Sequence, residues 1–419
     1  MTRLRALSGR AGGALLVCAS LFGCESIRSG ANPEVPLWTR RPSWSMQVVY
    51  SRSILASSRL ENEPYERGKP EIDSRGRRVF VGSSDHGLYA IRAEDGSILW
   101  RFETLSFVQS APLYDPEYDV VYFGSHDGAL YKVEAETGRL LWRFMTNAEV
   151  AQRPVLYQGS VFVVNANDTV VALEAKSGKK IWDYHRTPAA GMEVAGYAGP
   201  LLWRNKIYAA FSDGTVTAFD ALTGRERWQP VDLSAEAEQL VGEVPQYLDV
   251  DTTPVPDVID SGPVVFVGSY SGGVYALDAE SGSVVWSNTA VAGVYDLCLW
   301  EQPTHAARDG VGLGLPERSL LIASSGTTGL WALNPNDGRE VWRQTLPRGA
   351  VSGPVPVAGA LLVAASELGL FLISPLDGRL IDGIHMVDGS AMTPAAHGLR
   401  AFVLTNGGNF LSLHVSPPI

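Results

Sequence analysis

An internal repeat runs through most of this chain and limits its fold more than any other feature. Each copy has a short β-branched run, a Gly-containing turn, an alternating apolar run and a second turn ending in glycine, as in VFVGSSDHGLYAIRAEDGSILWRF (79–102). The second-turn glycines are Gly96, Gly138, Gly178, Gly224, Gly282, Gly338 and Gly378. Four residues after the first six stand the tryptophans, which are Trp100, Trp142, Trp182, Trp228, Trp286 and Trp342. A partial eighth copy occupies 401–415, so eight similar β units are expected.

The repeat predicts one all-β domain, an eight-bladed β-propeller over residues 44–419. A proline precedes the innermost strand of most copies, at Pro70, Pro112, Pro154, Pro200, Pro354 and Pro394. Four strands per copy form one propeller blade. The eighth copy ends before its outer strand, and residues 44–51 form an isolated strand-like run. Pairing of 44–51 with 409–415 would complete the eighth blade and close the ring, with seven blades as the alternative.

The six tryptophans are interpreted as structural. One blade cannot bury both of its faces alone, so a large ring on the outer strand is expected to fill the gap to the next blade. Each indole buries about 150–250 Å². At about 25 cal/mol per Å² this gives a gross gain of roughly 4–6 kcal/mol per ring. We therefore interpret these rings as blade-docking core and not as a ligand platform.

The net charge limits the classes of partner. The chain has 45 acidic and 34 basic side chains, a formal charge of −11 and an isoelectric point near 5.2. Nucleic-acid binding, and phosphate binding as a main task, require clustered Lys and Arg and are disfavoured by this balance. No nucleic-acid partner is expected.

The N-terminus has the pattern of a secretory signal. Three arginines precede the apolar run AGGALLVCASLFG, which is too short to span a bilayer. The run ends in Leu21-Phe22-Gly23-Cys24, which resembles the lipobox of bacterial lipoprotein precursors. The resemblance implies a signal peptide at 1–23, lipidation of Cys24 and a tether at 24–43. Glu25 favours the outer membrane, facing the periplasm; the alternative is an ordinary signal peptide with a chance cysteine.

Catalytic and metal-binding patterns are weak. The three cysteines, Cys18, Cys24 and Cys298, form neither a disulfide framework nor a CxxC site in the mature chain. The seven histidines show no paired ligand spacing. Ser125-His126-Asp127 has triad residue types, but the three residues are adjacent in a predicted turn. No catalytic residue, metal site or cofactor is predicted.

The AxxGxxxW pattern resembles the pyrroloquinoline-quinone-like repeat family over residues 70–415. Dehydrogenases of that family carry a vicinal cysteine pair over the cofactor, and this chain has no adjacent cysteines. A lipobox followed by a single propeller resembles instead the BamB lipoproteins of the outer-membrane barrel-assembly machinery. The resemblance implies a non-enzymatic scaffold, a monomer within a complex, whose partner is the periplasmic part of the central barrel-forming subunit.

Two segments carry the implied partner contacts. The string DVDTTP (249–254) looks like the BamB segment whose two acids dock the partner, which assigns Asp249 and Asp251; an Asx-type turn before a strand is the alternative. A second docking segment corresponds to 192–196 and assigns Val194, although the arginine of the family pattern is missing. There are two alternative functions. The chain could be a scaffold or ligand-binding protein of another envelope complex, or a quinone-dependent dehydrogenase. Residues 301–318 form a polar insertion that is either a surface loop or an extension of a binding face.

Overall fold

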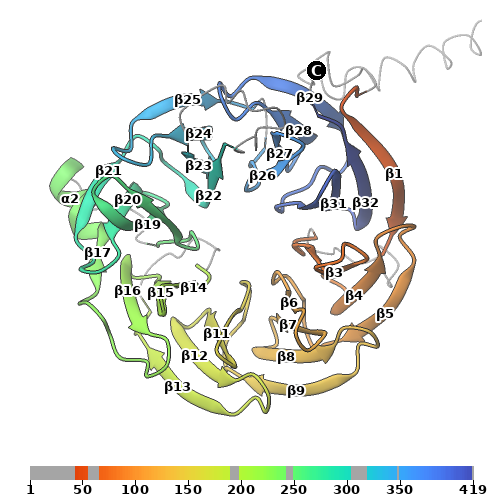
Figure 1. Ribbon diagram of the computed structural model, residues 1–419, viewed down its shortest axis with the longest axis horizontal. Helices are drawn as coiled ribbons and strands as arrows, with labels where there is room; N and C mark the ends of the chain where they lie inside the picture. The colour runs from red at the N-terminus through yellow and green to blue at the C-terminus, as the bar shows by residue number, and fades with distance from the viewer. Residues whose placement is uncertain are drawn as a thin grey trace, which may run out of the picture.

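The computed structural model describes residues 43–54, 66–188, 198–241, 249–302, 319–346 and 349–417. These residues form eight four-stranded antiparallel sheets arranged around a central axis (Figure 1). The all-β, eight-bladed propeller predicted from the repeat is therefore confirmed.

The first four blades follow one another along the chain. Blade 1 comprises β2 (Glu71–Ile72), β3 (Arg78–Gly82), β4 (Gly87–Arg92) and β5 (Ile98–Glu103). Blade 2 comprises β6 (Leu113–Asp115), β7 (Val120–Gly124), β8 (Ala129–Glu134) and β9 (Leu140–Met145). Blade 3 comprises β10 (Val155–Tyr157), β11 (Ser160–Asn165), β12 (Thr169–Glu174) and β13 (Lys180–His185). Blade 4 comprises β14 (Leu201–Trp203), β15 (Lys206–Ala210), β16 (Thr215–Asp220) and β17 (Val231–Asp232), and is followed by helix α2 (Leu233–Val241).

The remaining blades complete the ring. Blade 5 comprises β18 (Val255–Ile259), β19 (Gly262–Ser269), β20 (Gly273–Asp278) and β21 (Val284–Asn288). Blade 6 comprises β22 (Val294–Glu301), β23 (Ser319–Ser325), β24 (Gly329–Leu333) and β25 (Glu340–Gln344). Blade 7 comprises β26 (Val355–Val357), β27 (Ala360–Ala365), β28 (Gly369–Ile373) and β29 (Leu380–His385). Blade 8 comprises β30 (Ala395–His397), β31 (Arg400–Leu404), β32 (Asn409–Val415) and β1 (Met46–Ser53).

The ring closes where the sequence predicts. Strand β1 pairs with β32 in antiparallel register from Met46↔Val415 to Ser53↔Asn409. An N-terminal strand thus becomes the outer strand of the last blade, and β32 has no unpaired edge. In Figure 1 the N-terminal strand β1 lies beside the C-terminal strand β32.

The prolines of the repeat mark the start of the innermost strands. At each of the six predicted prolines, the strand begins at the next residue, for example Glu71 after Pro70 and Leu113 after Pro112. Pro254 stands in the same place before β18. Proline has no N–H to donate to a ladder and disfavours the helical conformation of the residue before it, so it suits the residue just before a strand.

The structure places each repeat tryptophan against the second-turn glycine of the following blade. A Cβ atom on Gly178, for example, would lie 2.7 Å from the Trp142 ring, so only glycine permits this contact at its positive φ of 70°. Five of the six indole N–H groups also donate to a carbonyl of the next blade at 2.8–3.1 Å. Neighbouring blades are thus joined by an indole on a glycine turn and one hydrogen bond.

Trp228 departs from this pattern. The repeat predicts every ring on an outer strand, but Trp228 precedes β17, which begins only at Val231 because Pro230 cannot donate to the ladder. Its ring lies on Gly282, as expected, but its N–H has no hydrogen-bond partner. The corresponding carbonyl, that of Ala279, accepts instead from Lys206 Nζ at 3.0 Å and from the Tyr208 hydroxyl at 3.1 Å.

The closing blade uses different side chains for the same purpose. Between blades 8 and 1, Tyr50 lies against Gly96 and its hydroxyl donates to the Ala93 carbonyl at 3.0 Å. Between blades 7 and 8 the usual glycine turn is missing, because strands β32 and β1 of blade 8 come from opposite ends of the chain and no turn joins them. Here the tryptophan position holds Asp382, whose carboxylate accepts from the backbone N–H groups of Trp44 at 2.8 Å and Ser45 at 2.7 Å. The missing seventh tryptophan is thus an adaptation to ring closure.

The propeller has two faces with different contents. Where the structure describes them, the hairpins that join strands one and two, and strands three and four, of a blade lie on one face of the propeller. The central hairpin and the connection to the next blade open on the other face, which we call the connection face. The chain enters β1 on the first face, because Gln47 pairs with His414 and His414 pairs with Arg400 at the hairpin end of blade 8. We call this the N-terminal face.

Candidate partner-binding surface

The segment 249–254 links blade 4 to blade 5 on the connection face. The Val250 N–H donates to the Phe211 carbonyl at 3.4 Å, and the Tyr270 N–H donates to the Asp249 carbonyl at 3.3 Å. Phe211 and Tyr270 each follow the second strand of their blade. The segment is therefore held between the central hairpins of two adjacent blades.

Thr252 has a structural function that recurs around the ring. Its hydroxyl accepts from the Gly268 N–H at 2.7 Å. Ser110 and Ser352, which also stand two residues before a proline, accept from backbone N–H groups at 2.9 Å in blades 2 and 7. The threonine of DVDTTP thus belongs to the propeller repeat, and the residues particular to this connection are its two acids.

Both acids are buried. Asp249 is 3% exposed and Asp251 is 5% exposed. Burial, and then the nearby Asp249 charge, raise the pKa of Asp251 to about 8. One carboxyl oxygen of Asp251, Oδ2, is buried without a hydrogen-bond partner. Asp251 is therefore protonated at neutral pH. Its Oδ2 atom could still form a hydrogen bond, which no group in the described part of the propeller provides.

The other predicted site residues lie outside the described residues. These are Cys24, Val194 and most of the 301–318 insertion, since 1–42, 189–197 and 303–318 are not described. Asp249 and Asp251 lie on one blade connection, close to each other, and their role in binding stays a prediction. A solvent-facing acidic pair is not what the structure shows, because neither side chain reaches the surface.

The described residues contain little that resembles a catalytic or metal centre. Burial raises the pKa of the Cys298 thiol to about 12, so this thiol on β22 is protonated and weakly nucleophilic at neutral pH. His126 Nδ1 pairs with Glu149 at 3.2 Å, while Asp127 accepts the Ala129 N–H as a turn residue. Across the described ranges no group of three or more His, Cys, Asp or Glu side chains could hold a metal ion. No helix of the described part of the chain is both long and apolar enough to cross a membrane.

A family model decides the relationship of this chain. The model described as outer membrane protein assembly factor BamB matches residues 36–118, 117–299 and 296–409. The chain belongs to the BamB family. The match covers blades 1 to 7 and most of blade 8, ending at the first residue of β32, so the BamB-like, quinone-type repeat seen in the sequence is confirmed as a family relationship.

Two BamB proteins illustrate the distance within the family. BamB of Legionella pneumophila (strain Paris) is 29% identical over 175 residues, which cover 42% of this chain and 40% of that protein. BamB of Yersinia pestis is 25% identical over 314 residues, which cover 74% of this chain and 62% of that protein. The chain therefore aligns with less than two thirds of either relative's length.

Solved structures share the fold. BamB from Moraxella catarrhalis superimposes with a TM-score of 0.67 at 18% identity, covering 88% of this chain and 99% of that one. Quinohemoprotein alcohol dehydrogenase from Comamonas testosteroni superimposes with a TM-score of 0.63 at 13% identity, covering 90% and 77%. At these identities the likeness extends to the propeller fold alone, which BamB shares with quinone-dependent enzymes.

Sequence reasoning missed three features of this BamB-family propeller. Two of them are the contacts that Tyr50 and Asp382 make where the ring closes. Position 382 could have been noticed, because it is the place in the repeat where aspartate stands instead of tryptophan. Sequence reasoning also overlooked the run Arg75-Gly76-Arg77-Arg78, a basic cluster in an acidic chain that lines a pocket on the N-terminal face.

Proposed function

We propose that this chain is a lipid-anchored, non-enzymatic scaffold that assists the assembly and insertion of β-barrel proteins into the outer membrane. The observation that carries the proposal is the BamB family match across residues 36–409. The proposed location is the outer membrane, facing the periplasm, with Cys24 as the anchor. The proposed partner is the periplasmic part of the central barrel-forming subunit, and the chain acts as a monomer within that complex without a cofactor.

The connection face is the proposed docking face. It carries Asp249 and Asp251, and β13 ends and β14 begins at the same face; Val194, which falls between these two strands in sequence, lies outside the described residues. It lies opposite the face at which the chain enters the propeller from residue 43. A chain anchored through Cys24 could thus bind a partner on one face while its other face lies toward the bilayer.

Affinity purification from detergent-solubilised envelopes tests this function. The tagged wild-type chain should recover the barrel-forming subunit. Asp249→Ala with Asp251→Ala removes two buried carboxyl groups that support the docking connection, and should lower that recovery about tenfold or more, which corresponds to about 1.4 kcal/mol or more of binding free energy. Asp257→Ala with Asp260→Ala is the matched control, because it removes two acids near the opposite end of blade 5. Circular dichroism melts of both variants separate lost binding from lost folding.

Three results would contradict the proposal. Recovery of a different envelope complex would support the alternative scaffold function. Equal recovery by the Asp249/Asp251 variant and its control would remove these acids from the interface. Dye reduction on addition of pyrroloquinoline quinone and Ca²⁺ would point to a dehydrogenase.

A further inference from the structure

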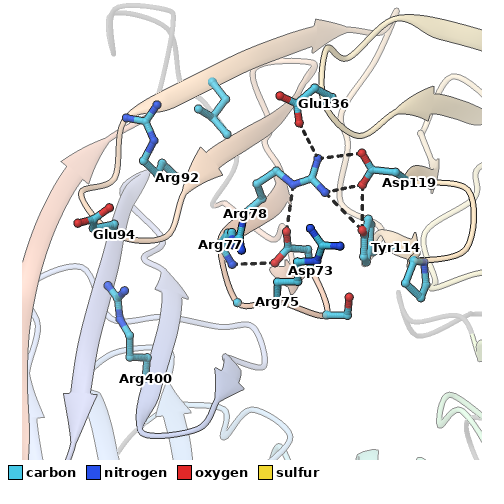
Figure 2. Close-up of a pocket in the computed structure, with 14 residues that line it drawn as sticks. Asp73, Arg75, Arg77, Arg78, Arg92, Glu94, Tyr114, Asp119, Glu136 and Arg400 are labelled. Atoms are coloured by element: carbon cyan, nitrogen blue, oxygen red, sulfur yellow. Dashed lines mark hydrogen bonds and ion pairs between the residues drawn. The ribbon is translucent and has the colours of Figure 1, made fainter.

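A pocket of about 710 Å³ opens on the N-terminal face, where blades 8, 1 and 2 meet. Its lining combines the 73–78 hairpin of blade 1, the 92–99 turn, and Arg400 from blade 8 with the 114–119 hairpin and Glu136 of blade 2 (Figure 2). Nine of the fourteen lining residues are charged, so the pocket suits a polar, charged ligand and not an apolar one.

One wall of the pocket is an internal ion-pair network. Arg78 Nε lies 3.0 Å from Asp73, its Nη2 pairs with Asp119, and its Nη1 lies 3.4 Å from Glu136. The guanidinium also lies over the Tyr114 ring, 5.6 Å from its centroid. Figure 2 shows these partners grouped around Arg78. Three of the four acidic residues that line the pocket thus form ion pairs with Arg78, which holds this wall together.

The remaining lining charge is mostly positive. Four further arginines line the pocket, namely Arg75, Arg77, Arg92 and Arg400, against one further acid, Glu94. Arg92 is held by Ser97 at 2.8 Å and by Asp95 at 3.4 Å. Arg400 is held by the Ala93 carbonyl at 2.6 Å and by Ser412 at 2.8 Å. These two guanidinium groups are fixed in place by the protein, and each has N–H donors left over.

Arg75 and Arg77 are the two remaining cations of the lining. Both side chains are exposed, and within the described ranges neither guanidinium has a hydrogen bond or ion pair. With Arg92 and Arg400 they approach the pocket from three separate chain segments. A phosphate group offers oxygen acceptors in several directions, which suits donors from several sides better than the two coplanar oxygens of a carboxylate do.

The position of the pocket points to a membrane lipid as the molecule that carries the phosphate group. Arg400 pairs in register with His414 and, through it, with Gln47 at the start of β1, so the pocket opens on the face where the chain enters the propeller. Between Cys24 and Ser43 there are 18 residues, which span at most about 65 Å when fully extended. With the lipid anchor of the proposed function, the point where the chain enters this face stays within about 65 Å of the lipid headgroups.

We propose that the arginine pocket on the N-terminal face binds the phosphate group of anionic membrane lipids and orients the propeller on the bilayer. The lipid as source rests on the proposed anchor. The formal charge of −11 makes general attraction to an anionic surface unfavourable. Binding therefore has to come from a local site, and the pocket is such a site.

Vesicle sedimentation of the mature chain carrying Cys24→Ala tests the pocket without the acyl anchor. The chain should sediment with vesicles of phosphatidylcholine plus phosphatidylglycerol and not with phosphatidylcholine alone. Arg75→Gln with Arg77→Gln removes two charged hydrogen-bond donors from the phosphate site and should weaken binding about 30-fold or more, which corresponds to about 2 kcal/mol. The matched control is Arg339→Gln with Arg379→Gln, which removes the same charge from exposed turns of blades 6 and 7 on the same face.

The arms of the experiment separate the alternatives. Equal losses in the pocket variant and the control would mean diffuse electrostatics and would overturn the proposal. Pocket-dependent binding of glycerol 3-phosphate without vesicle binding would overturn the lipid source, and pocket-dependent binding of an acidic peptide instead would overturn the phosphate. Vesicle binding is independent of the envelope purification described above, so loss of partner recovery with intact vesicle binding refutes only the proposed function.

Discussion

At the scale of single residues, the most unusual group is the Asp251 carboxyl. It is buried beside a second carboxyl, and its Oδ2 atom has no hydrogen-bond partner. Such a group stabilises nothing in the isolated propeller, since a buried polar atom without a partner costs about 1–3 kcal/mol.

Asp251→Asn should stabilise the protein in a pH-dependent way. The pKa of Asp251 rises from an ordinary 3.8 to about 8 in the folded chain, mainly by burial. Between these values the unfolded chain loses the proton and the folded chain keeps it, so the wild type loses stability as the pH rises from about 4 to about 8. The asparagine variant avoids this loss, so its stability relative to the wild type should rise by on the order of 5 kcal/mol between pH 4 and pH 8, from about 4 pKa units at about 1.4 kcal/mol each.

Urea denaturation of both chains at pH 5 and pH 8.5 measures this difference. Asp260→Asn, at an exposed position of the same blade, is the control and should show no comparable change. A stability difference between wild type and Asp251→Asn that does not grow with pH would show that the folded carboxyl is ionised.

At the scale of elements, the unit of stability is the contact between neighbouring blades. The Trp142 ring of β9 lies on Gly178, and its N–H donates to the Ala175 carbonyl at 3.1 Å. Trp142→Ala removes the ring and the hydrogen bond and leaves a cavity between blades 2 and 3. We expect a loss of roughly 3–5 kcal/mol in the free energy of unfolding, measured by urea denaturation followed by circular dichroism. Trp44→Ala is the control, because that ring is 88% exposed, and a similar loss in both variants would contradict the docking role.

Much of the fold could be predicted because each blade repeats the same local rules. The prolines, the turn glycines and the alternating runs each specify local backbone geometry, so eight imperfect copies predict eight similar sheets. The closing strand was predictable because a last blade without an outer strand leaves an unpaired edge. The departures arise where the repeat is interrupted, at Pro230 before β17 and at Asp382, where the chain ends meet.

The candidate site was less predictable, for a different physical reason. Sequence pattern specifies which residues share a strand or a turn, but burial of a connection depends on both neighbouring blades. DVDTTP therefore indicated two acids at a docking segment but not that both are buried between central hairpins. The arginine pocket combines residues from blades 8, 1 and 2, including Arg78 and Arg400, which are over 300 positions apart in sequence.

At the scale of the whole molecule, the two faces of the propeller carry different features. The connection face carries the Asp249 and Asp251 segment, and the N-terminal face carries the arginine pocket and the point at which the chain enters the propeller. An anchor at Cys24 would hold the second face toward the bilayer and leave the first toward the periplasm. The rigid ring of indole contacts would then fix the distance between the two faces.

This orientation depends on lipidation of Cys24, which Cys24→Ala tests. The variant should lose labelling by radioactive palmitate and move from the membrane fraction to the soluble periplasmic fraction, because each buried acyl CH₂ contributes about 0.8 kcal/mol to membrane binding and the pocket alone does not match several acyl chains. Cys298→Ala is the matched control, since its thiol lies on β22 within the propeller and should keep both label and membrane retention. If Cys24→Ala stays in the membrane fraction, or Cys298→Ala loses the label, the anchor lies elsewhere and the N-terminal face need not lie toward the bilayer.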